Sequence, residues 1–147
     1  ADQIKALDAC TIQSEPIASI DLMERAGQAF VSWFCRQIDP VKTVAIICGT
    51  GNNGGDGLVI ARLLTEYNYK VEVWIVKGKS KSSPEFLDNF NRLASKLTIH
   101  EINDESDLNK ISFDDYDVLV DALFGTGLSR SLSGIYESVI SRLNKAK

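Results

Sequence analysis

The feature that most constrains the fold of this chain is an apolar run, Val44 to Cys48, that leads directly into the glycine-rich segment Gly49 to Gly57. The run is continuous and rich in β-branched residues, which is typical of a parallel strand buried on both faces. Five of the nine residues that follow it are glycine. Glycine lets backbone N–H groups approach a phosphate closely, and the N-terminus of a following helix adds partial positive charge. These residues therefore predict a strand, an anion-binding turn and a helix; the alternative is a tight turn in which glycine serves packing alone.

Apolar runs and helical stripes alternate along the rest of the chain. Spacing and capping signals predict a first helix that starts at Ser19 and is closed by Pro40, and its apolar stripe consists of Leu22, Ala26, Phe30, Trp33 and Phe34. Further helices are predicted over 58–67, after the pair Ser83 and Pro84, and after Ser133. The predicted strands that follow the first one cover 71–76, 97–102 and 118–124. Such alternation indicates an α/β protein with a three-layer Rossmann-like fold, in which helices flank a mostly parallel sheet. We expect a single domain over residues 1–147, because no linker or repeat divides the chain.

Charge and cysteine usage narrow the range of partners. Sixteen basic and twenty acidic residues give a net charge of -4. The sequence has no stripe of Lys and Arg of the kind that indicates nucleic-acid binding. No apolar run approaches the roughly 18 residues that a membrane span requires. Cys10, Cys35 and Cys48 lack metal-like spacing and fit reduced core thiols, and Ala1 to Leu7 has no secretory pattern. We therefore expect a cytoplasmic protein.

The glycine segment matches no single nucleotide-binding motif. Gly49, Gly51 and Gly54 satisfy the G-x-G-x-x-G spacing of dinucleotide-binding folds. The acidic residue expected at the end of the second strand is absent, however, because Glu72 lies inside that strand. No Lys-Ser or Lys-Thr pair follows the last glycine, which argues against a nucleoside triphosphatase. Side-chain oxygens that can coordinate a hard cation or bind a polar ligand belong to Asn52, Asn53 and Asp56.

A second glycine-containing segment, Asp121 to Ser131, follows another apolar run. A carboxylate inside an apolar run is costly unless it is paired, bound to a cation or protonated, so Asp121 predicts a functional role. The alternative is that Asp121 caps neighbouring backbone amides. In the commonest doubly wound order the first and fourth strands are neighbours, and ligands bind in the crevice between their carboxyl ends. We therefore expect the two glycine segments to meet in one crevice.

Other polar and aromatic residues carry weaker signals. His100 has no obvious acid or nucleophile beside it in its short polar strand, so we do not assign it a catalytic role. Trp33 and Phe34 fall on a helical stripe and fit a core or dimer surface rather than a stacking platform. Lys77 and Arg130 can help to hold a phosphate, although a solvated surface charge is the alternative for Lys77.

Four segments carry a recognisable signature. In chain order they are Ala1 to Ile4 with Leu7 and Asp8, Leu22 to Gly27, Gly49 to Leu58, and Val120 to Leu128. Together these segments resemble the motifs of the NAD(P)H-hydrate epimerases, the YjeF N-terminal domain family, over essentially the whole chain. The resemblance implies a homodimeric isomerase that interconverts the R and S epimers of hydrated NADH and NADPH, called NAD(P)HX. A partner dehydratase, separate or fused downstream, would then restore the cofactor from the S form.

The resemblance also implies a set of site residues. Substrate contacts would come from Asn52, Asn53, Gly54, Gly55 and Asp56 and from Gly125, Thr126, Gly127, Leu128, Ser129, Arg130 and Ser131. Asn53 and Asp121 would bind a potassium ion. Epimerisation calls for an ionisable group in the crevice, and Asp121 is the candidate for this catalytic role, either as acid and base or through the cation.

The family pattern extends beyond Lys147. Its members continue with a strand that ends in an Asp-x-Pro-Ser-Gly-like segment, which supplies a ligand-binding aspartate and a cation-binding serine. We therefore expect an incomplete domain, truncated at its C-terminus. The alternatives are a non-catalytic binding or dimerisation scaffold of the same fold, as in messenger-RNA decapping factors, and a kinase relative without a recognisable phosphoryl-transfer motif. The presence of Asn52, Asn53, Asp56 and Asp121 favours the enzyme.

Overall fold

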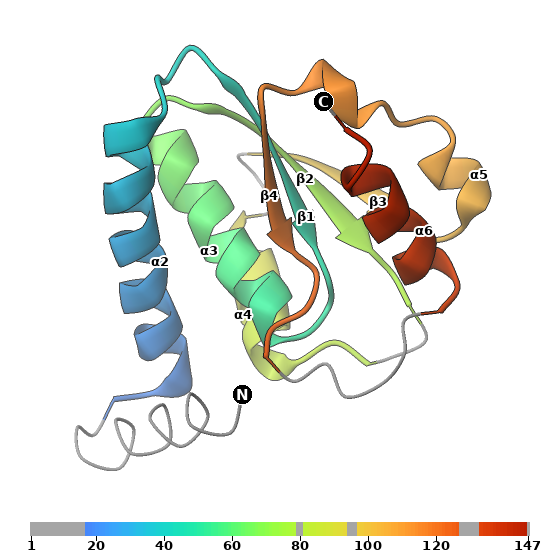
Figure 1. The fold of residues 1–147 in the computed structure, drawn as a ribbon. Helices are drawn as coiled ribbons and strands as arrows, with labels where there is room; N and C mark the ends of the chain where they lie inside the picture. Colours follow the sequence, from blue (N-terminus) through green and yellow to red (C-terminus); the bar gives the residue numbers. More distant parts are fainter. Residues whose placement is uncertain (1–16, 79–80, 94–96, 127–132, 147) are drawn as a thin grey trace.

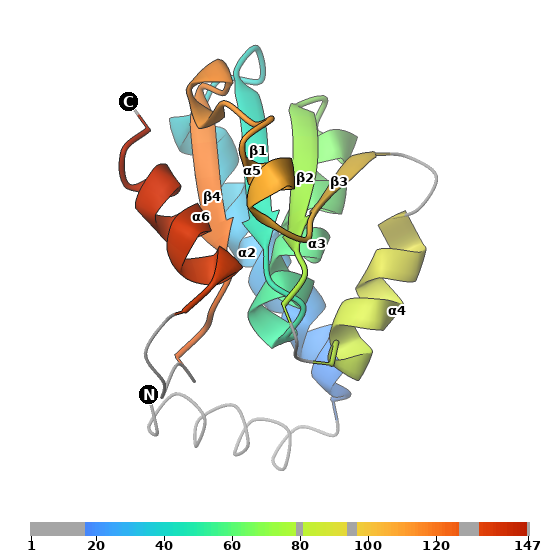
Figure 2. The same ribbon diagram turned by 90° about the vertical axis from the view of Figure 1, so that its right-hand side faces the viewer.

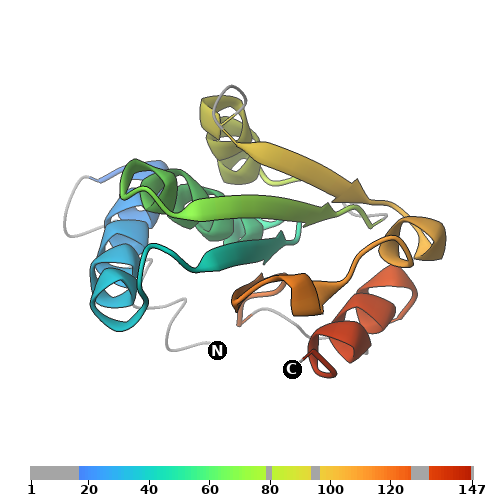
Figure 3. The same cartoon turned by 90° about the horizontal axis from the view of Figure 1, so that it is seen from above.

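The computed structural model describes residues 17–78, 81–93, 97–126 and 133–146. Its centre is a parallel sheet of four strands in the order β3-β2-β1-β4. The strands are β1 (Thr43–Cys48), β2 (Lys70–Val76), β3 (Thr98–Ile102) and β4 (Val118–Ala122). Figure 3 shows the four strands side by side between the helices. The predicted pairing of the first and fourth strands is confirmed.

Helices cover both faces of the sheet and complete the three predicted layers (Figure 1). On one face lie α2 (Ser19–Gln37), α3 (Asn52–Glu66) and α4 (Pro84–Leu93), and on the other lie α5 (Glu105–Leu108), the 3-10 helix η1 (Phe113–Asp115) and α6 (Ile135–Leu143). Figure 2 shows α5 and α6 in front of the strands and α2 and α3 behind them. In the described part of the chain, no helix is both long and apolar enough to cross a membrane.

Both faces of β1 are buried, as its sequence predicts. Alternate residues of a strand point to opposite faces of the sheet. Val44, Ile46 and Cys48 join the core on the side of α2, α3 and α4, whereas Ala45 and Ile47 join the core on the side of α5 and α6. All five side chains are fully buried. The strand therefore holds the glycine segment that follows it in a fixed place.

The buried face of α2 differs from the predicted stripe. Its buried residues are Met23, Gly27, Val31 and Phe34, so only Phe34 of the predicted stripe is buried. The reason is Gly27, which lets α2 approach α3 so closely that a Cβ on Gly27 would lie 2.5 Å from Val59 Cγ1. Trp33 is 51% exposed as a result.

The boundaries of the later helices follow their capping signals in part. The Ser83 hydroxyl accepts a hydrogen bond from Phe86 N at 3.2 Å, and α4 begins at Pro84, so the predicted cap is confirmed. Helix α6 begins at Ile135 after an N-cap at Gly134, whose φ of 64° suits glycine. The prediction that Ser133 opens this helix is therefore wrong.

Candidate functional site

Helix α3 begins at Asn52, earlier than the predicted start at Leu58. Residues 52–57 are therefore helical, which corrects the prediction of a loop at this point. Glycine disfavours a helix interior, and this preference is overridden here by close packing of the helix against the strands. The consequence is that the N-terminus of α3 lies immediately after β1.

Close contact explains some of the glycines but not all of them. A Cβ on Gly54 would overlap the carbonyl oxygen of Gly49. A Cβ on Gly57 would lie 2.6 Å from the Cβ of Ala122 in β4. Gly51 differs, because no atom of the described residues lies within 4 Å of the position its Cβ would take. The alternative in which glycine serves packing alone therefore accounts for Gly54 and Gly57 but not for Gly51.

The N-terminus of α3 presents backbone donors beside Gly51. Gly51 is the N-cap residue, and no side chain of the described residues caps the helix there. The first turn closes with the bond from Gly55 N to Gly51 O, at 3.0 Å. N–H groups that precede Gly55 have no acceptor within the helix, and the helix dipole adds partial positive charge beside them. This end of α3 therefore suits an anion such as a pyrophosphate.

Asp121 lies near the carboxyl end of β4, opposite Ile47 of β1. The residue is exposed, which corrects the prediction of a carboxylate in apolar surroundings. The reason is its position at the end of a strand that has only β1 as a neighbour in the described part of the chain. Asp121 Oδ1 accepts a hydrogen bond from Leu123 N at 2.9 Å, so the contact named as the alternative, the capping of a backbone amide, is present. Its second oxygen, Oδ2, has no partner among the residues described and can accept a bond from a ligand.

The two glycine-containing segments meet at the carboxyl ends of β1 and β4, as predicted (Figure 1). Gly49 N donates to Ala122 O at 3.0 Å and extends the strand pairing beyond β1. Gly125 lies beside Asn53, because a Cβ on Gly125 would be 3.5 Å from Asn53 Cβ and 3.7 Å from Asn53 Oδ1. The start of α3 and the segment after β4 therefore form adjoining walls.

Only some of the residues that are expected to contact the substrate lie in the part of the chain that the structure describes. Asn52, Gly125 and Thr126 are exposed, Asn53 and Asp56 are half-buried, and Gly54 and Gly55 are buried. Asn52 and Asp56 are four residues apart on α3 and share one face of the helix. Gly127, Leu128, Ser129, Arg130 and Ser131 lie outside the described residues.

Asn53 and Asp121 offer oxygen ligands for a cation. An amide oxygen and a carboxylate oxygen are hard donors, which suit an alkali or alkaline-earth ion better than a soft metal. In the described segments, no group of three or more His, Cys, Asp and Glu side chains could hold a metal ion. A site with a single carboxylate carries little negative charge, and this fits a monovalent cation better than a divalent one.

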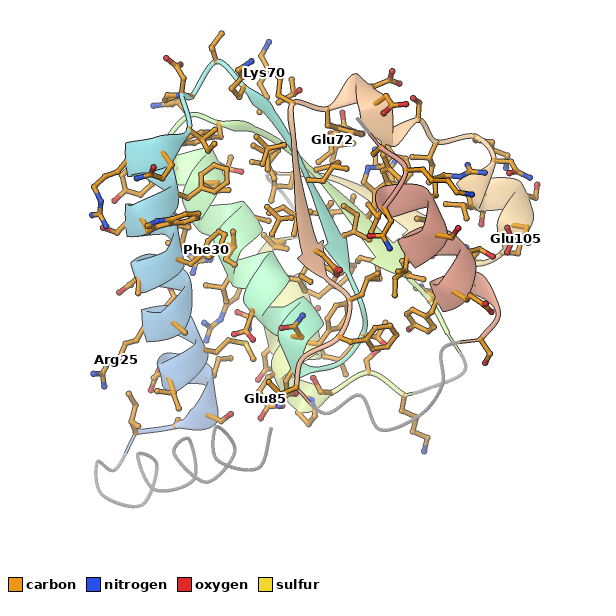
Figure 4. The ribbon with its side chains drawn as sticks, viewed as in Figure 1. Arg25, Phe30, Lys70, Glu72, Glu85 and Glu105 are labelled. Carbon is orange, nitrogen blue, oxygen red and sulfur yellow. The ribbon has the colours of Figure 1, made fainter. Side chains whose placement is uncertain are left out.

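His100 has an acidic neighbour, which corrects the prediction that none lies beside it. Its Nε2 is 3.0 Å from Glu72 Oε2, and its ring stacks on Trp74 with centroids 4.0 Å apart. Tyr116 Oη donates to the same oxygen of Glu72 at 2.8 Å. Burial, followed by the bond to Glu72, raises the pKa of Tyr116 to about 12. Figure 4 shows Glu72 toward the edge where the strands begin, away from the glycine segments.

A cavity of about 440 Å³ opens at that opposite edge of the sheet. Its lining residues are Thr43, Lys70, Val71, Glu72, Thr98, Asp115 and Tyr116. The glycine segments stay the candidate site instead, for two reasons. Ligands of parallel α/β sheets bind at the carboxyl ends of the strands, and the Glu72 carboxylate already has hydrogen-bonding neighbours in Tyr116 and His100.

The motif Leu22 to Gly27 supports the site without lining it. Met23 Sδ lies 3.0 Å from where a Cβ on Gly55 would be, and Glu24 Oε2 pairs with Arg62 Nη2 at 2.5 Å. These contacts hold α2 on α3. The motif therefore fixes the helix whose N-terminus lies beside the segment that follows β4.

Two contacts beside the glycine segments could not be predicted from the sequence. The carbonyl oxygen of Thr50 accepts a hydrogen bond from Ser83 N at 2.9 Å, which brings the segment after β2 to the glycine segment. Tyr136 Oη donates to Val76 O at 3.1 Å, and its ring lies 4.8 Å from that of Phe124. Tyr136 gives no local signal for this role, because a tyrosine in a helix commonly serves packing alone.

Comparisons with known proteins agree on one family. A family model described as YjeF-related protein N-terminus matches residues 19–147. The NAD(P)H-hydrate epimerase of Lentilactobacillus buchneri is 38% identical over 144 residues, which cover 97% of this chain and 64% of that protein. The bifunctional NAD(P)H-hydrate repair enzyme of Thermofilum pendens is 37% identical over 144 residues, with 97% of this chain and 28% of that protein covered.

A solved structure confirms the fold. The crystal structure of the yeast protein ynu0 matches with a TM-score of 0.80 at 25% identity, covering 99% of this chain and 64% of that one. The chain thus spans less than two thirds of the length of each of these three relatives.

Proposed function

The chain belongs to the family of YjeF-related protein N-termini, and we propose that its protein is an isomerase that interconverts the R and S epimers of NAD(P)HX. In this proposal the hydrate binds between the N-terminus of α3 and the segment after β4. The relatives named NAD(P)H-hydrate epimerase support this substrate.

The observation that carries the proposal is the approach of Gly125 to Asn53. It brings the uncapped end of α3, which suits the pyrophosphate of a dinucleotide, beside the strand end that holds Asp121. In this proposal the end of α3 binds the pyrophosphate, and the exposed carboxylate of Asp121 at the neighbouring strand end serves the reacting ring. A dinucleotide whose uncharged ring must react needs both features.

Asp121 can supply the proton transfers of this reaction. Epimerisation at the hydroxyl-bearing ring carbon requires the hydroxyl group to leave one face of the ring and to return to the other. A proton donated to the leaving oxygen assists the first step, and a base that accepts a proton from water assists the second. The bond from Leu123 N fixes Oδ1 of Asp121 and leaves Oδ2 for this exchange.

We propose as the alternative role of Asp121 that it acts through a cation, in which case Asn53 and Asp121 would bind a potassium ion. Their oxygen atoms and their single negative charge fit such an ion, as described above. When bound, the ion would supply positive charge beside the polar groups of the hydrate. Its removal by dialysis against a sodium buffer should raise the KM of the hydrate, because sodium is smaller and fits the same oxygens less well.

The first experiment measures epimer interconversion by the protein at its natural full length, with potassium present. An added dehydratase that consumes only the S form drains the S epimer, so that loss of the R epimer above its spontaneous rate reports epimerase activity. Asp121→Asn should lower kcat by about a hundredfold or more, because general acid and base catalysis contributes on that scale. Circular dichroism should show an unchanged fold, since Asp121 is exposed.

The matched control is Asp115→Asn. Asp115 is an exposed aspartate of η1, before β4 begins, at the opposite edge of the sheet. This variant should keep wild-type turnover. Unchanged turnover in Asp121→Asn would exclude Asp121 as the catalytic group. Binding of the hydrate by a wild-type protein without any turnover would support the scaffold alternative instead.

The family resemblance also supports a homodimer and a dehydratase as functional partner. The dehydratase removes the S form that the epimerase supplies, and the relative from Thermofilum pendens is a bifunctional repair enzyme. We place the reaction in the cytoplasm, which agrees with the free thiols of Cys35 and Cys48.

A further inference from the structure

An ion pair lies at the carboxyl ends of β2 and β3. Lys77 Nζ is 2.6 Å from Glu101 Oε1, and both side chains are nearly half exposed. Lys77 directly follows β2, and its backbone nitrogen donates to Ile102 O in β3 at 2.9 Å. Glu101 comes from β3, where it pairs in register with Ile75 of β2. The pair therefore combines one charge from the end of each strand.

The backbone of this region is tied to the glycine segment Gly49 to Gly57. Strand β2 is the neighbour of β1, and the chain after β2 returns to the glycine segment through the bond from Ser83 N to Thr50 O. Tyr136 Oη holds Val76 O at the end of β2, and Gly78 leaves no room for a Cβ beside the Tyr136 ring. Lys77 is thus presented from a fixed strand end, on the side of β1 opposite β4.

This position has a defined role in dinucleotide-binding sheets of the same strand order. A carboxylate at the end of the second strand binds the 2′-hydroxyl of the adenosine ribose, and a basic side chain nearby accommodates a 2′-phosphate. The second strand of this chain lacks such a carboxylate, since Glu72 lies in its first half. Glu101 of β3 supplies a carboxylate at the same edge, beside a lysine.

We propose that Lys77 and Glu101 together recognise the group at the 2′-position of the adenosine ribose of the hydrate, an inference that rests on the proposed function. With NADPHX, Lys77 turns from Glu101 to the 2′-phosphate. With NADHX, Lys77 stays paired, and Glu101 accepts a hydrogen bond from the 2′-hydroxyl. The two charges thus let one crevice take both substrates.

The chemistry of the pair suits this exchange. An exposed ion pair is weak, so it opens at little cost, and a 2′-phosphate carries close to two negative charges at neutral pH against one on Glu101. Lysine therefore gains a stronger partner when the phosphate is present. A surface ion pair that does not contact the substrate would not distinguish NADPHX from NADHX.

The test compares the KM for NADPHX with the KM for NADHX in the full-length protein. Lys77→Gln should raise the ratio of the two values about tenfold, the scale of one charge-assisted hydrogen bond. Glu101→Gln should lower the ratio about threefold, because it removes a negative charge beside the phosphate and a charged acceptor for the hydroxyl. High salt should reduce both changes.

Lys70→Gln is the matched control. Lys70 opens the same strand at the opposite edge (Figure 4) and is exposed, so the change in net charge is the same and only the place differs. The ratio of the KM for NADPHX to the KM for NADHX should be the same in Lys70→Gln as in the wild type. An active wild type whose ratio is unchanged in Lys77→Gln and Glu101→Gln would overturn the inference and leave the epimerase proposal standing.

A wild type without activity on either hydrate would overturn the epimerase proposal, and a binding measurement would then decide the inference. Calorimetry with adenosine 2′,5′-bisphosphate and adenosine 5′-monophosphate probes the 2′-position without turnover. Lys77→Gln should weaken the bisphosphate about tenfold relative to the monophosphate. An equal effect on both probes, or none, would contradict the assignment.

Discussion

The α-carbon of Gly54 lies so close to the carbonyl oxygen of Gly49 that a Cβ on Gly54 would overlap this oxygen. The obstacle is a backbone atom, which cannot swing aside as the end of a side chain can. This contact joins the first turn of α3 to the residue that follows β1. It therefore sets where the free N–H groups of the helix lie relative to the sheet.

Gly54→Ala should destabilise the protein by about 3 kcal/mol, because an overpacked methyl group must displace the backbone. The midpoint of urea unfolding measures the change. The control is Gly51→Ala, since no described atom lies within 4 Å of its Cβ position. That variant should lose no more than about 1 kcal/mol, the difference between glycine and alanine at an N-cap. Equal losses in both variants would refute the packing explanation.

Asp117 joins the start of β4 to the start of β1. Its carboxylate accepts hydrogen bonds from Thr43 N at 2.8 Å and from the Thr43 hydroxyl at 2.9 Å, and Lys42 Nζ lies 3.0 Å away. The bonds from Thr43 and then from Lys42 lower the pKa of Asp117 from 3.8 to about 2. The pKa is lower in the folded state, so the stabilisation is present above pH 3.8 and is lost as the pH falls through about 2.

Asp117→Asn should therefore reduce the free energy of unfolding at neutral pH and flatten its decline toward pH 2. Urea unfolding at several acidic pH values compares the variant with the wild type. Asp115→Asn serves again as control, because Asp115 is an exposed aspartate two residues away in the sequence. The same steep decline in wild type and Asp117→Asn would show that Asp117 does not cause it.

Tyr116 should affect stability at alkaline pH. Burial and the bond to Glu72 raise its pKa from 10.0 to about 12. The folded-state pKa lies above the unfolded value, so this stabilisation is complete below pH 10 and is lost as the pH rises through about 12. Tyr116→Phe should weaken the alkaline decline of the unfolding free energy. Spectroscopic titration should show one high-pKa tyrosine fewer, and a titration curve identical to wild type would contradict the assignment.

The sheet could be predicted because its strands carry their signal locally. The run Val44 to Cys48 is apolar at every position, and only burial on both faces explains such a run. The cap at Ser83 is local as well, since the hydroxyl and the following proline suffice to start a helix. The meeting of the two glycine segments followed from strand order, which is a general property of doubly wound sheets.

Features that depend on contacts between distant segments could not be predicted in this way. The buried face of α2 is set by Gly27 against Val59 of α3, and a helical stripe read alone does not show which neighbour will come closest. His100 acquires Glu72 as a partner only through the register of β2 and β3. The exposure of Asp121 likewise depends on which strands flank β4.

The homodimer that we propose has a candidate surface on α2. Trp33 is 51% exposed, and its ring lies 5.7 Å from that of Phe30, which Figure 4 shows on α2. An exposed tryptophan beside a second aromatic ring is typical of an interface anchor.

Trp33→Glu should raise the dimer dissociation constant by about thirtyfold or more, the scale of a hot-spot residue, as measured by sedimentation equilibrium. Leu87→Glu is the control, because Leu87 is similarly exposed at 49% but lies on α4. If both variants weaken the dimer equally, or if neither variant weakens it, the interface lies elsewhere. A monomeric wild type would exclude the homodimer itself.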